Sequence, residues 1–510
     1  MKKHITKIFK ASWYPFTIAA YPPLALLAFN ISEVDYTAGL RSLVITLIAV
    51  TTLLLILRQV YRDWHRAAFA TAALTGLFYT YGHAYDLISE KWEVPHLTAW
   101  MLGAWLVLSA LALVWAGRRK TRFKKAAVGL NIASLGLVLY TAGSIVLWSV
   151  PAPSTSGPVD DYAPLQELVV PEGQTPPDIY YIIVDSYGRS DLLQRDIDYD
   201  NSAFIQRLEE LGFYVADCTQ SNYNRTDVSM ASSLNMDYLQ NLDDDYQSGS
   251  TTRRTLWDSI SHSTVRANLE SAGYKTMAFA SGFAWSEIKD ADVYFAPSLL
   301  WSQMTGFETL LLRTTPARHF EGLGWINLDR IDGERYRERT GLVFNSMDDL
   351  ARMPGPKFVF IHIIPPHPPF IYGPDGTPTD PAPFLDENRR YPAASYTLGY
   401  LNQAVYISGQ LETALSTLLS ESSTPPVIIL QGDHAPWLQT GTDRFLILNA
   451  YYLPGHIDLL YPAISPVNSF RLVFNTYFGT DYDLLPDSSY YSPVPNIYEF
   501  DEVSNPCLTP

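Results

Sequence analysis

The amino-acid sequence predicts an α/β protein in two parts. An N-terminal bundle of five transmembrane helices precedes an extracellular domain with a mostly parallel sheet covered by helices on both faces. Five uncharged apolar stretches lie within residues 1–150, which carry 15 basic and 6 acidic residues, a net charge of +9. Residues 151–510 carry 21 basic and 46 acidic residues, a net charge of −25. From Asp178 onward, short apolar runs alternate with amphipathic segments, as in a parallel sheet with crossover helices.

The composition excludes some classes of protein. Only 17% of the 510 residues are charged, whereas roughly a quarter is usual in soluble domains. The uneven charge excludes a uniform cytosolic enzyme, and the acidic larger part argues against nucleic acid as a partner. The two cysteines, Cys218 and Cys507, form at most one disulfide, and the sequence leaves open whether they do.

The apolar stretches have the length of membrane spans, for which about 20 residues are needed. They are Ala11–Ser32, Ser42–Leu57, Ala67–Tyr85, Leu97–Gly117 and Ala126–Val150. The second stretch is short, but Arg41 and Arg58 flank it and their side chains can reach outward to the interface. Three prolines, Pro15, Pro22 and Pro23, predict that the first helix is kinked or broken.

Basic residues in the loops predict the orientation of the chain in the membrane. Thirteen lie before the first stretch or in the loops after the second and fourth, and only Arg41 and Lys91 lie in the alternate loops. The basic loops face the cytoplasm, so the N-terminus is cytoplasmic, and an odd number of spans puts all residues after Val150 outside. A cleaved signal peptide fits poorly because the apolar stretches recur. We therefore expect a multi-pass protein of the cell membrane.

The remaining chain divides into three regions. Residues 151–177 contain seven prolines among polar residues and predict an extended linker. Residues 178–443 carry the strand and helix signals. Residues 444–510 are rich in Tyr and Pro and predict a smaller C-terminal region packed on that domain.

Each element of the α/β domain follows from its local pattern. Ile179–Val184 is a continuous apolar run between turn residues, which is typical of a strand buried on both faces. Further strands are expected at Phe213–Ala216, Lys275–Ala280, Phe358–Ile364 and Val427–Leu430. Amphipathic helices are expected at Phe204–Leu211, Val265–Ala272 and Asn402–Leu419.

Residues with metal-binding and nucleophilic chemistry follow these strands, at the edge where open α/β sheets bind ligands. Asp185 ends the first strand, and Asp433 and His434 follow the strand at Val427–Leu430. Two carboxylates and an imidazole suit Zn²⁺ or Mn²⁺ with one position open. The hydroxyl of Thr226, where a loop enters a helix, would become a nucleophile in that position. His367, among prolines, is a candidate to protonate a leaving oxygen or to contact a phosphoryl oxygen.

Each of these residues also has a structural explanation. Asp185 could cap a helix, Gly-Asp-His occurs in many turns, and the hydroxyls near Thr226 could serve capping and packing. His362 lies within a strand, where a core histidine is the better interpretation. Ser229, three residues after Thr226 and on the same helix face, is a competing nucleophile, and we favour Thr226.

Together the motifs resemble a known family. The five spans, the linker, Ile-Val-Asp-Ser, the Thr226 loop, His-Pro-Pro-Phe and Gly-Asp-His occur in the order found in the alkaline phosphatase/sulfatase superfamily. Within it, the chain most resembles the lipoteichoic acid synthase type of membrane phosphoglycerol and phosphoethanolamine transferases. The resemblance implies that Asp185, Thr226, Asp433 and His434 hold one divalent ion, Mn²⁺, Zn²⁺ or Mg²⁺. It further implies that Thr226 takes the phosphoryl group and that His367 contacts substrate.

The resemblance implies an activity as well. A phosphoglycerol or phosphoethanolamine group would move from a lipid of the phosphatidylglycerol or phosphatidylethanolamine class to an envelope glycan or glycolipid, through a covalent Thr226 intermediate. Two alternatives stay open: a hydrolase that uses water to cleave phosphodiesters or sulfate esters, and an inactive envelope scaffold.

The sequence also departs from the pattern of the family that it resembles. Cys218 is followed by Thr-Gln-Ser-Asn and lacks the Pro and Arg of the sulfatase formylglycine motif, so true sulfatase chemistry is not expected. Only His362 and His367 could serve a second metal, so we expect one. The glycerol-phosphate-binding residues have no clear counterpart except a weak candidate in Trp285, which leaves the head group and acceptor open. The sequence is silent on the oligomeric state.

Overall fold

The computed structural model describes residues 11–31, 34, 37–92, 94–118, 122–149, 166–250, 253–297, 304–320, 328–385, 390–505 and 507. The chain forms two compact units. Unit 1 comprises Met1–Ser154 and Leu300–Asp332, and unit 2 comprises Thr155–Leu299 and Gly333–Pro510. The described residues 304–320 and 328–332 fall within the range predicted for the α/β domain, whereas in the structure they belong to unit 1.

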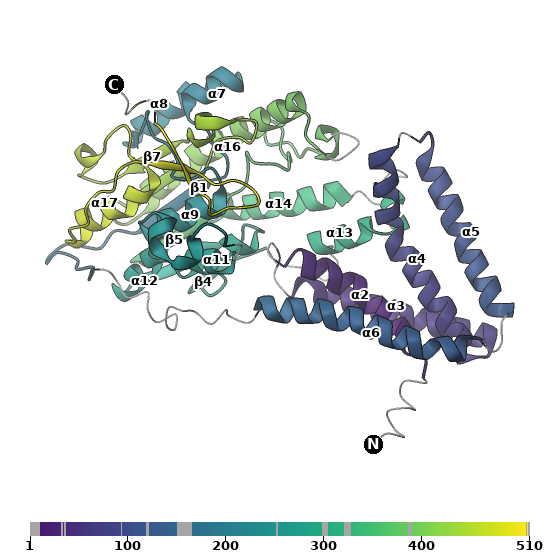
Figure 1. The fold of residues 1–510 in the computed structure, drawn as a ribbon. Helices are drawn as coiled ribbons and strands as arrows, with labels where there is room; N and C mark the ends of the chain where they lie inside the picture. The colour runs from purple at the N-terminus through teal and green to yellow at the C-terminus, as the bar shows by residue number, and fades with distance from the viewer. Residues whose placement is uncertain are drawn as a thin grey trace. The chain divides into compact units, whose positions relative to one another are not determined.

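Unit 1 contains one helix for each apolar stretch (Figure 1). These helices are α2 (Tyr14–Phe29), α3 (Ala38–Tyr61), α4 (Trp64–Lys91), α5 (Leu97–Arg118) and α6 (Arg122–Ser149). Helix α2 packs against α3, α4 and α6, and α4 packs against α5. Small side chains of α4, among them Ala67, Ala68 and Ala70, are fully or almost fully buried and allow this close packing.

Three of these helices, α3, α5 and α6, are long and apolar enough to cross a membrane. Large apolar side chains on them are exposed, for example Ile48 at 62% and Leu106 at 60%, as expected for surfaces that face lipid. Helix α2 is apolar but has only 16 residues. It is a single helix with Pro22 and Pro23 inside it, so the break that the prolines allowed does not occur.

The second segment of unit 1 adds α13 (Gly306–Arg313) and a 3-10 helix at Pro316–Phe320. The Thr305 side chain and Glu308 form a capping box that begins α13. Glu308 also forms an ion pair with Arg41 of α3. Gly82 of α4 donates its N–H to the Thr314 carbonyl (2.8 Å), an approach so close that a Cβ at residue 82 would overlap the Thr314 backbone.

Unit 2 is built on a seven-stranded sheet in the order β2-β7-β6-β1-β5-β3-β4. Strands β6, β1, β5, β3 and β4 are parallel, and β2 and β7 are antiparallel to their neighbours. The predicted mostly parallel sheet is therefore confirmed. The strands are β1 (Ile179–Val184), β2 (Tyr214–Val215), β3 (Lys275–Phe279), β4 (Val293–Phe295), β5 (Lys357–Ile363), β6 (Val427–Gly432) and β7 (Asn449–Tyr452).

Helices cover both faces of this sheet, as predicted, and side chains of β1 enter two cores in alternation. Tyr181 and Ile183 pack on one face and Tyr180 and Ile182 on the other. The first core contains side chains of α9 (Thr226–Asn235), α11 (Arg254–Ser261), α12 (Thr264–Ser271) and α17 (Pro466–Phe478). The second contains side chains of α7 (Ser190–Asp196), α8 (Ser202–Glu210), α14 (Leu328–Asn345), α15 (Met347–Arg352) and α16 (Ala393–Glu421). Burial on both faces explains why every residue of β1 is apolar.

Short elements complete unit 2. Helix α10 spans Leu239–Leu242, and 3-10 helices span Asp244–Tyr246, Ala284–Ser286, Ala382–Phe384, Gly441–Phe445 and Ile457–Leu459. Strands β8 (Ser489–Tyr491) and β9 (Asp501–Val503) form a separate two-stranded sheet.

The two regions that flank the predicted domain share its core. Within residues 444–510, β7 joins the main sheet and α17 covers one face, so this region is an integral part of unit 2. Residues 151–165 of the predicted linker lie outside the described residues. Its later part packs on unit 2, because Leu168 is buried in the first core and Val169 donates its N–H to the Phe478 carbonyl (3.0 Å).

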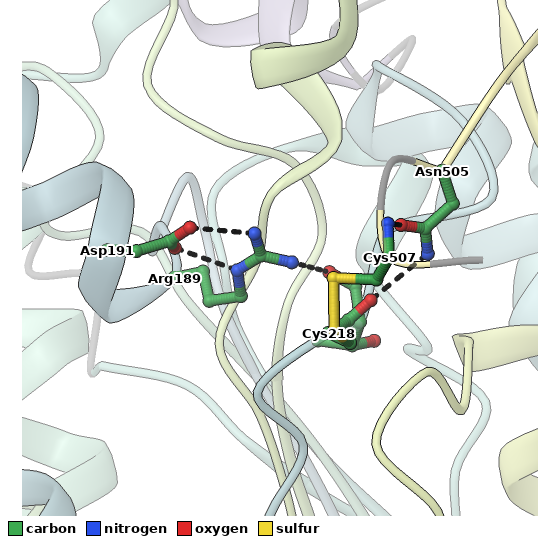
Figure 2. The surroundings of a disulfide bond; sticks show 6 residues. Arg189, Asp191, Cys218, Asn505 and Cys507 are labelled. Atoms are coloured by element: carbon green, nitrogen blue, oxygen red, sulfur yellow. Dashed lines mark hydrogen bonds and ion pairs between the residues drawn. A yellow bond between two sulfur atoms is a disulfide. The ribbon is translucent and has the colours of Figure 1, made fainter. Parts of the chain in front are cut away.

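Cys218 and Cys507 form a disulfide, the point that the sequence left open (Figure 2). Asn505 lies beside it, donating from Nδ2 to the Cys218 carbonyl and accepting from the Cys507 N–H, both at 3.0 Å. The bond joins residues 289 positions apart and attaches the C-terminal segment to the chain that leads into α9.

Candidate active site

Two adjacent parallel strands, β1 and β6, bring three of the predicted metal ligands to one edge of the sheet. Val184, the last residue of β1, pairs with Gly432 of β6 on one side and Ile363 of β5 on the other. The residues that follow these strands therefore emerge together. One ligand atom each from Asp185, Asp433 and His434 lie within 4.8 Å of one another, and all three residues are buried.

Thr226 completes this group from a different element. It is the first residue of α9, after Arg225 in extended conformation. Its Oγ1 lies 3.1 Å from Nε2 of His434. The same Nε2 is 3.9 Å from Oδ1 of Asp185 and 3.6 Å from Oδ2 of Asp433. Two carboxylates, an imidazole and a hydroxyl thus face one another.

The backbone holds the His434 ring in the orientation that a ligand needs. Its Nδ1 donates to the carbonyl of Ala435 (2.8 Å), which leaves the Nε2 lone pair directed toward the carboxylates and Thr226. Burial lowers the pKa of His434, and the charge of Arg444 lowers it further. The ring is therefore held in its neutral form, the form that binds metals.

Asp185 is held as a carboxylate despite its burial. Burial by itself would raise its pKa, but the charge of His367 and the hydrogen bond and charge of His362 outweigh that effect. The pKa of Asp185 therefore lies below its usual range. This acid is ionised at neutral pH and available to a cation.

Ser186 joins the two carboxylates and is absent from the predicted site, although it belongs to the Ile-Val-Asp-Ser motif. Its backbone is in the left-handed region (φ 61°), which turns its N–H toward Oδ1 of Asp433 at 2.8 Å. Its hydroxyl donates to Oδ1 of Asp185 at 3.1 Å and lies 3.2 Å from Nδ1 of His434. The only local signal was a serine directly after a predicted ligand.

The donor set fits a single divalent cation. Oδ2 of Asp433 is buried and has no hydrogen-bond partner among the described residues. A buried carboxylate oxygen without a partner is costly unless a cation binds it. Two carboxylates with one imidazole and a hydroxyl match the ligand types and number of a four-coordinate site.

The remaining candidate residues have different surroundings. The Ser229 hydroxyl donates to the backbone carbonyl of Asp433 (2.8 Å), so it supports the ligand loop. His367 is half-buried, and its Nδ1 donates to the Pro368 carbonyl (2.7 Å). His362 is buried, with Nε2 at 3.5 Å from Oδ2 of Asp185 and Nδ1 at 3.1 Å from the Ser286 hydroxyl. The ring of Trp285 lies against that of His362, at 5.5 Å between ring centres.

Arg444 is a second residue of the site that the sequence did not predict. Its Nη1 donates to the Ala435 carbonyl (2.6 Å), and its Nε donates to the Asn224 carbonyl (3.3 Å). One guanidinium thus joins the loop after β6 to the loop before α9. No local pattern identifies it, because its partners are defined only by the folded chain.

Comparisons with known proteins give distant structural likenesses. No family model matches the chain, and no match was found among curated proteins. The C-terminal periplasmic domain of EptC from Escherichia coli, in complex with Zn, is 13% identical, with 62% of this chain and 87% of that chain covered and a TM-score of 0.41. The integral membrane lipooligosaccharide phosphoethanolamine transferase A from Neisseria meningitidis is 11% identical, with 92% of this chain and 95% of that chain covered and a TM-score of 0.40.

A 2-O GAG sulfatase, BT1596, is 11% identical, with 61% of this chain and 72% of that chain covered and a TM-score of 0.36. The solved structures that this chain resembles thus include phosphoethanolamine transferases and sulfatases, enzymes that act on phosphate or sulfate esters.

Proposed function

We propose that the protein is a membrane-anchored, metal-dependent transferase that moves a phosphoryl-alcohol group from a lipid through a covalent intermediate on Thr226. The observation that carries this proposal is the Thr226 hydroxyl facing Asp185, Asp433 and His434. The Ser229 hydroxyl, the competing nucleophile, is occupied by the Asp433 carbonyl.

The residues present supply the parts of such a transfer. A divalent ion (Mn²⁺, Zn²⁺ or Mg²⁺) held by Asp185, Asp433, His434 and Thr226 would lower the pKa of the hydroxyl and offset the charge of the phosphodiester. Oγ1 of Thr226, having lost its proton to solvent, bonds to phosphorus, and the bond from phosphorus to the diacylglycerol oxygen breaks. His367 is our candidate to protonate that oxygen. In the second step His367, which gave up its proton in the first, takes the proton of an acceptor hydroxyl, whose oxygen bonds to the same phosphorus as the bond from phosphorus to Oγ1 of Thr226 breaks.

The start of α9 provides the place for the transferred group. Thr226 is the first residue of this ten-residue helix, so backbone N–H groups of the first turn lie next to its hydroxyl, although that of Val228 donates to Oδ1 of Asp227 (3.1 Å). Such N–H groups and the positive end of the helix dipole bind phosphoryl oxygens. The donor in our proposal is phosphatidylglycerol or phosphatidylethanolamine, and the acceptor is an envelope glycan or glycolipid.

Two observations support catalysis outside the cytoplasm. The basic residues of the unit 1 loops favour a cytoplasmic N-terminus, which puts unit 2 on the opposite side after five spans. The disulfide between Cys218 and Cys507 fits an oxidising compartment. We infer that unit 1 anchors the protein in the cell membrane and that unit 2 is the extracytoplasmic catalytic domain.

The mass of the intact protein after incubation with Mn²⁺ and either phosphatidylglycerol or phosphatidylethanolamine tests the proposal. We expect wild type to gain a glycerophosphate or phosphoethanolamine adduct, and its mass names the head group. Thr226→Ala and Asp433→Ala should gain none and should lose transfer activity. Ser229→Ala, the matched control on the same helix face, should still form the adduct.

The other outcomes are equally informative. An adduct or full activity in Thr226→Ala would contradict the covalent mechanism. Release of the free head group by wild type, with water as the acceptor and without net transfer, would indicate a hydrolase. Absence of both bound metal and adduct under metal-replete conditions would favour the inactive scaffold.

A further inference from the structure

Unit 1 contains a cavity that the proposed transfer does not use. It has a volume of about 250 Å³ and lies between α3, α4 and the segment Met304–Leu312. Its walls are mainly apolar, with Ile45, Phe78 and Leu312 among them, and one end is polar, with Arg41, Ser42 and Glu308. The lining therefore has the two-part character of a site for an amphiphile.

The polar end contains the Ser42 hydroxyl, which has no hydrogen-bond partner among the described residues. Nε of Arg41 donates to Oε1 of Glu308 (2.5 Å), and these two side chains pair at a second point as well. The hydroxyls of Thr46 and Tyr79, also in the lining, bond to each other at 2.8 Å. Ser42 differs from them, because it is only 4% exposed and its hydroxyl has no hydrogen-bond partner in the described part of the chain. A buried hydroxyl without a partner is costly, so a ligand oxygen at this point would be favourable.

The apolar part of the cavity is continuous with the lipid-facing surface of α3. Ile45 lines the cavity and is also 55% exposed, between Val44 at 53% and Ile48 at 62%. Because α3 is one of the helices that are long and apolar enough to span a membrane, this face contacts hydrocarbon rather than water. A cavity of about 150 Å³ with apolar walls is sufficient to bind benzene, so this larger one has room for part of a hydrocarbon chain.

We propose that this cavity binds one phospholipid molecule from the bilayer. An acyl chain enters past Ile45 and packs against Leu312, and the Ser42 hydroxyl donates to an ester or phosphate oxygen. Arg41 and Ser42 lie in the first turns of α3, at the depth where a spanning helix meets the interface and where the glycerol backbone of a lipid lies. This site concerns lipid binding to the membrane unit and does not depend on the transfer chemistry of unit 2.

Photolabelling of the full-length protein tests the proposal. The protein is reconstituted in nanodiscs of phosphatidylcholine that contain a fraction of the same lipid with a diazirine on one acyl chain. Labelled peptides are then mapped by mass spectrometry. We expect labelling at Met304 and Leu312 in excess of that on the exposed faces of α5 and α6.

Two cavity-filling variants, Leu312→Trp and Met304→Trp, should lose this excess. Ile48→Trp is the matched control, because Ile48 lies on the exposed face of α3 outside the lining. It should keep the wild-type pattern. Ser42→Ala should weaken occupancy by phospholipid about two- to tenfold, the effect of one hydrogen bond. It should leave labelling by an apolar diazirine without a head group unchanged.

Labelling of the same strength along every exposed helix face, insensitive to both cavity-filling variants, would overturn the proposal and indicate only general contact with the bilayer. Unchanged phospholipid occupancy in Ser42→Ala would overturn the assignment of the polar end. Each variant is compared with wild type by monodisperse elution and thermal unfolding. Leu312→Trp and Met304→Trp both fill the cavity from the same wall, so the test can still be made if one of them fails to fold.

Discussion

At the scale of single residues, Ser186 connects three of the four protein groups that face the proposed metal position, Asp185, Asp433 and His434. It donates to both carboxylates through different atoms, its N–H to Asp433 and its hydroxyl to Asp185. Outer groups of this kind fix the direction of metal ligands, and their loss typically lowers metal affinity about ten- to a hundredfold.

Ser186→Ala should therefore weaken binding of Zn²⁺ or Mn²⁺ by about ten- to a hundredfold, because the Asp185 carboxylate loses its donor. Metal titration with calorimetric detection measures this. Ser190→Ala, on the same segment but away from the ligands, is the control and should bind as wild type does. Equal affinities in wild type and Ser186→Ala would show that the carboxylates are held by the backbone alone.

Lys357 makes a second residue-scale contribution, to stability. It is fully buried at the start of β5, and its ammonium group pairs with Asp178 and donates to the Met353 carbonyl (2.9 Å). Removing one partner of a buried ion pair leaves the other charge without compensation.

Lys357→Met should lower the free energy of unfolding of unit 2 by about 3–5 kcal/mol. The double variant Lys357→Met/Asp178→Asn should recover a large part of this loss, since no isolated charge is left. Pulse proteolysis of the full-length protein compares the two. A double variant no more stable than the single one would argue that packing, not charge, is responsible.

At the scale of elements, α16 carries two glycines with opposite surroundings. A Cβ at Gly399 would overlap the aromatic ring of Phe370, whereas a Cβ at Gly409 would have no neighbouring atom within 4 Å. The long helix thus approaches the segment after β5 closely at Gly399, and glycine is needed there for space rather than for backbone freedom.

Gly409→Ala should stabilise unit 2 by up to about 1 kcal/mol, because alanine is the better helix former. Gly399→Ala should destabilise it, because the new methyl group displaces Phe370, and overpacking costs about 1–3 kcal/mol. Thermal unfolding of both variants, each serving as the control for the other, measures the difference. A stabilising Gly399→Ala would mean that the ring moves freely.

At the scale of the whole molecule, the disulfide offers a test of the side of the membrane on which unit 2 lies. Cys218 and Cys507 are the only cysteines of the chain, and both are in this bond. The segment beside Cys218 is held further by Arg189, which donates from Nη1 to the Thr219 carbonyl (3.0 Å) and pairs with Asp191 (Figure 2).

If unit 2 is extracytoplasmic, protein purified without reductant should contain no thiol that reacts with a maleimide after denaturation. Cys507→Ser should expose one thiol and lose about 2–5 kcal/mol of stability, because the C-terminal segment is no longer tethered. Reductant should lower the unfolding temperature of wild type and leave the Cys218→Ser/Cys507→Ser variant unchanged. Two reactive thiols in freshly purified wild type would instead favour a reducing compartment.

The sequence alone determined the features that depend on neighbouring residues. Continuous or periodic apolar patterns report burial locally, so the five helices of unit 1, the strand Ile179–Val184 and the mostly parallel sheet were all predictable. The candidate ligands were also found from local position, because residues that follow parallel strands emerge at one edge.

Only the tertiary structure decided the features that depend on contacts between distant segments. Examples are the assignment of residues 304–320 and 328–332 to unit 1, the pairing of the two cysteines, and the positions of Ser186 and Arg444 at the candidate site. The antiparallel β7, which puts part of the supposed C-terminal region into the main sheet, is another. Their determinants are hydrogen bonds and packing between residues up to several hundred positions apart, for which a one-dimensional pattern carries no signal.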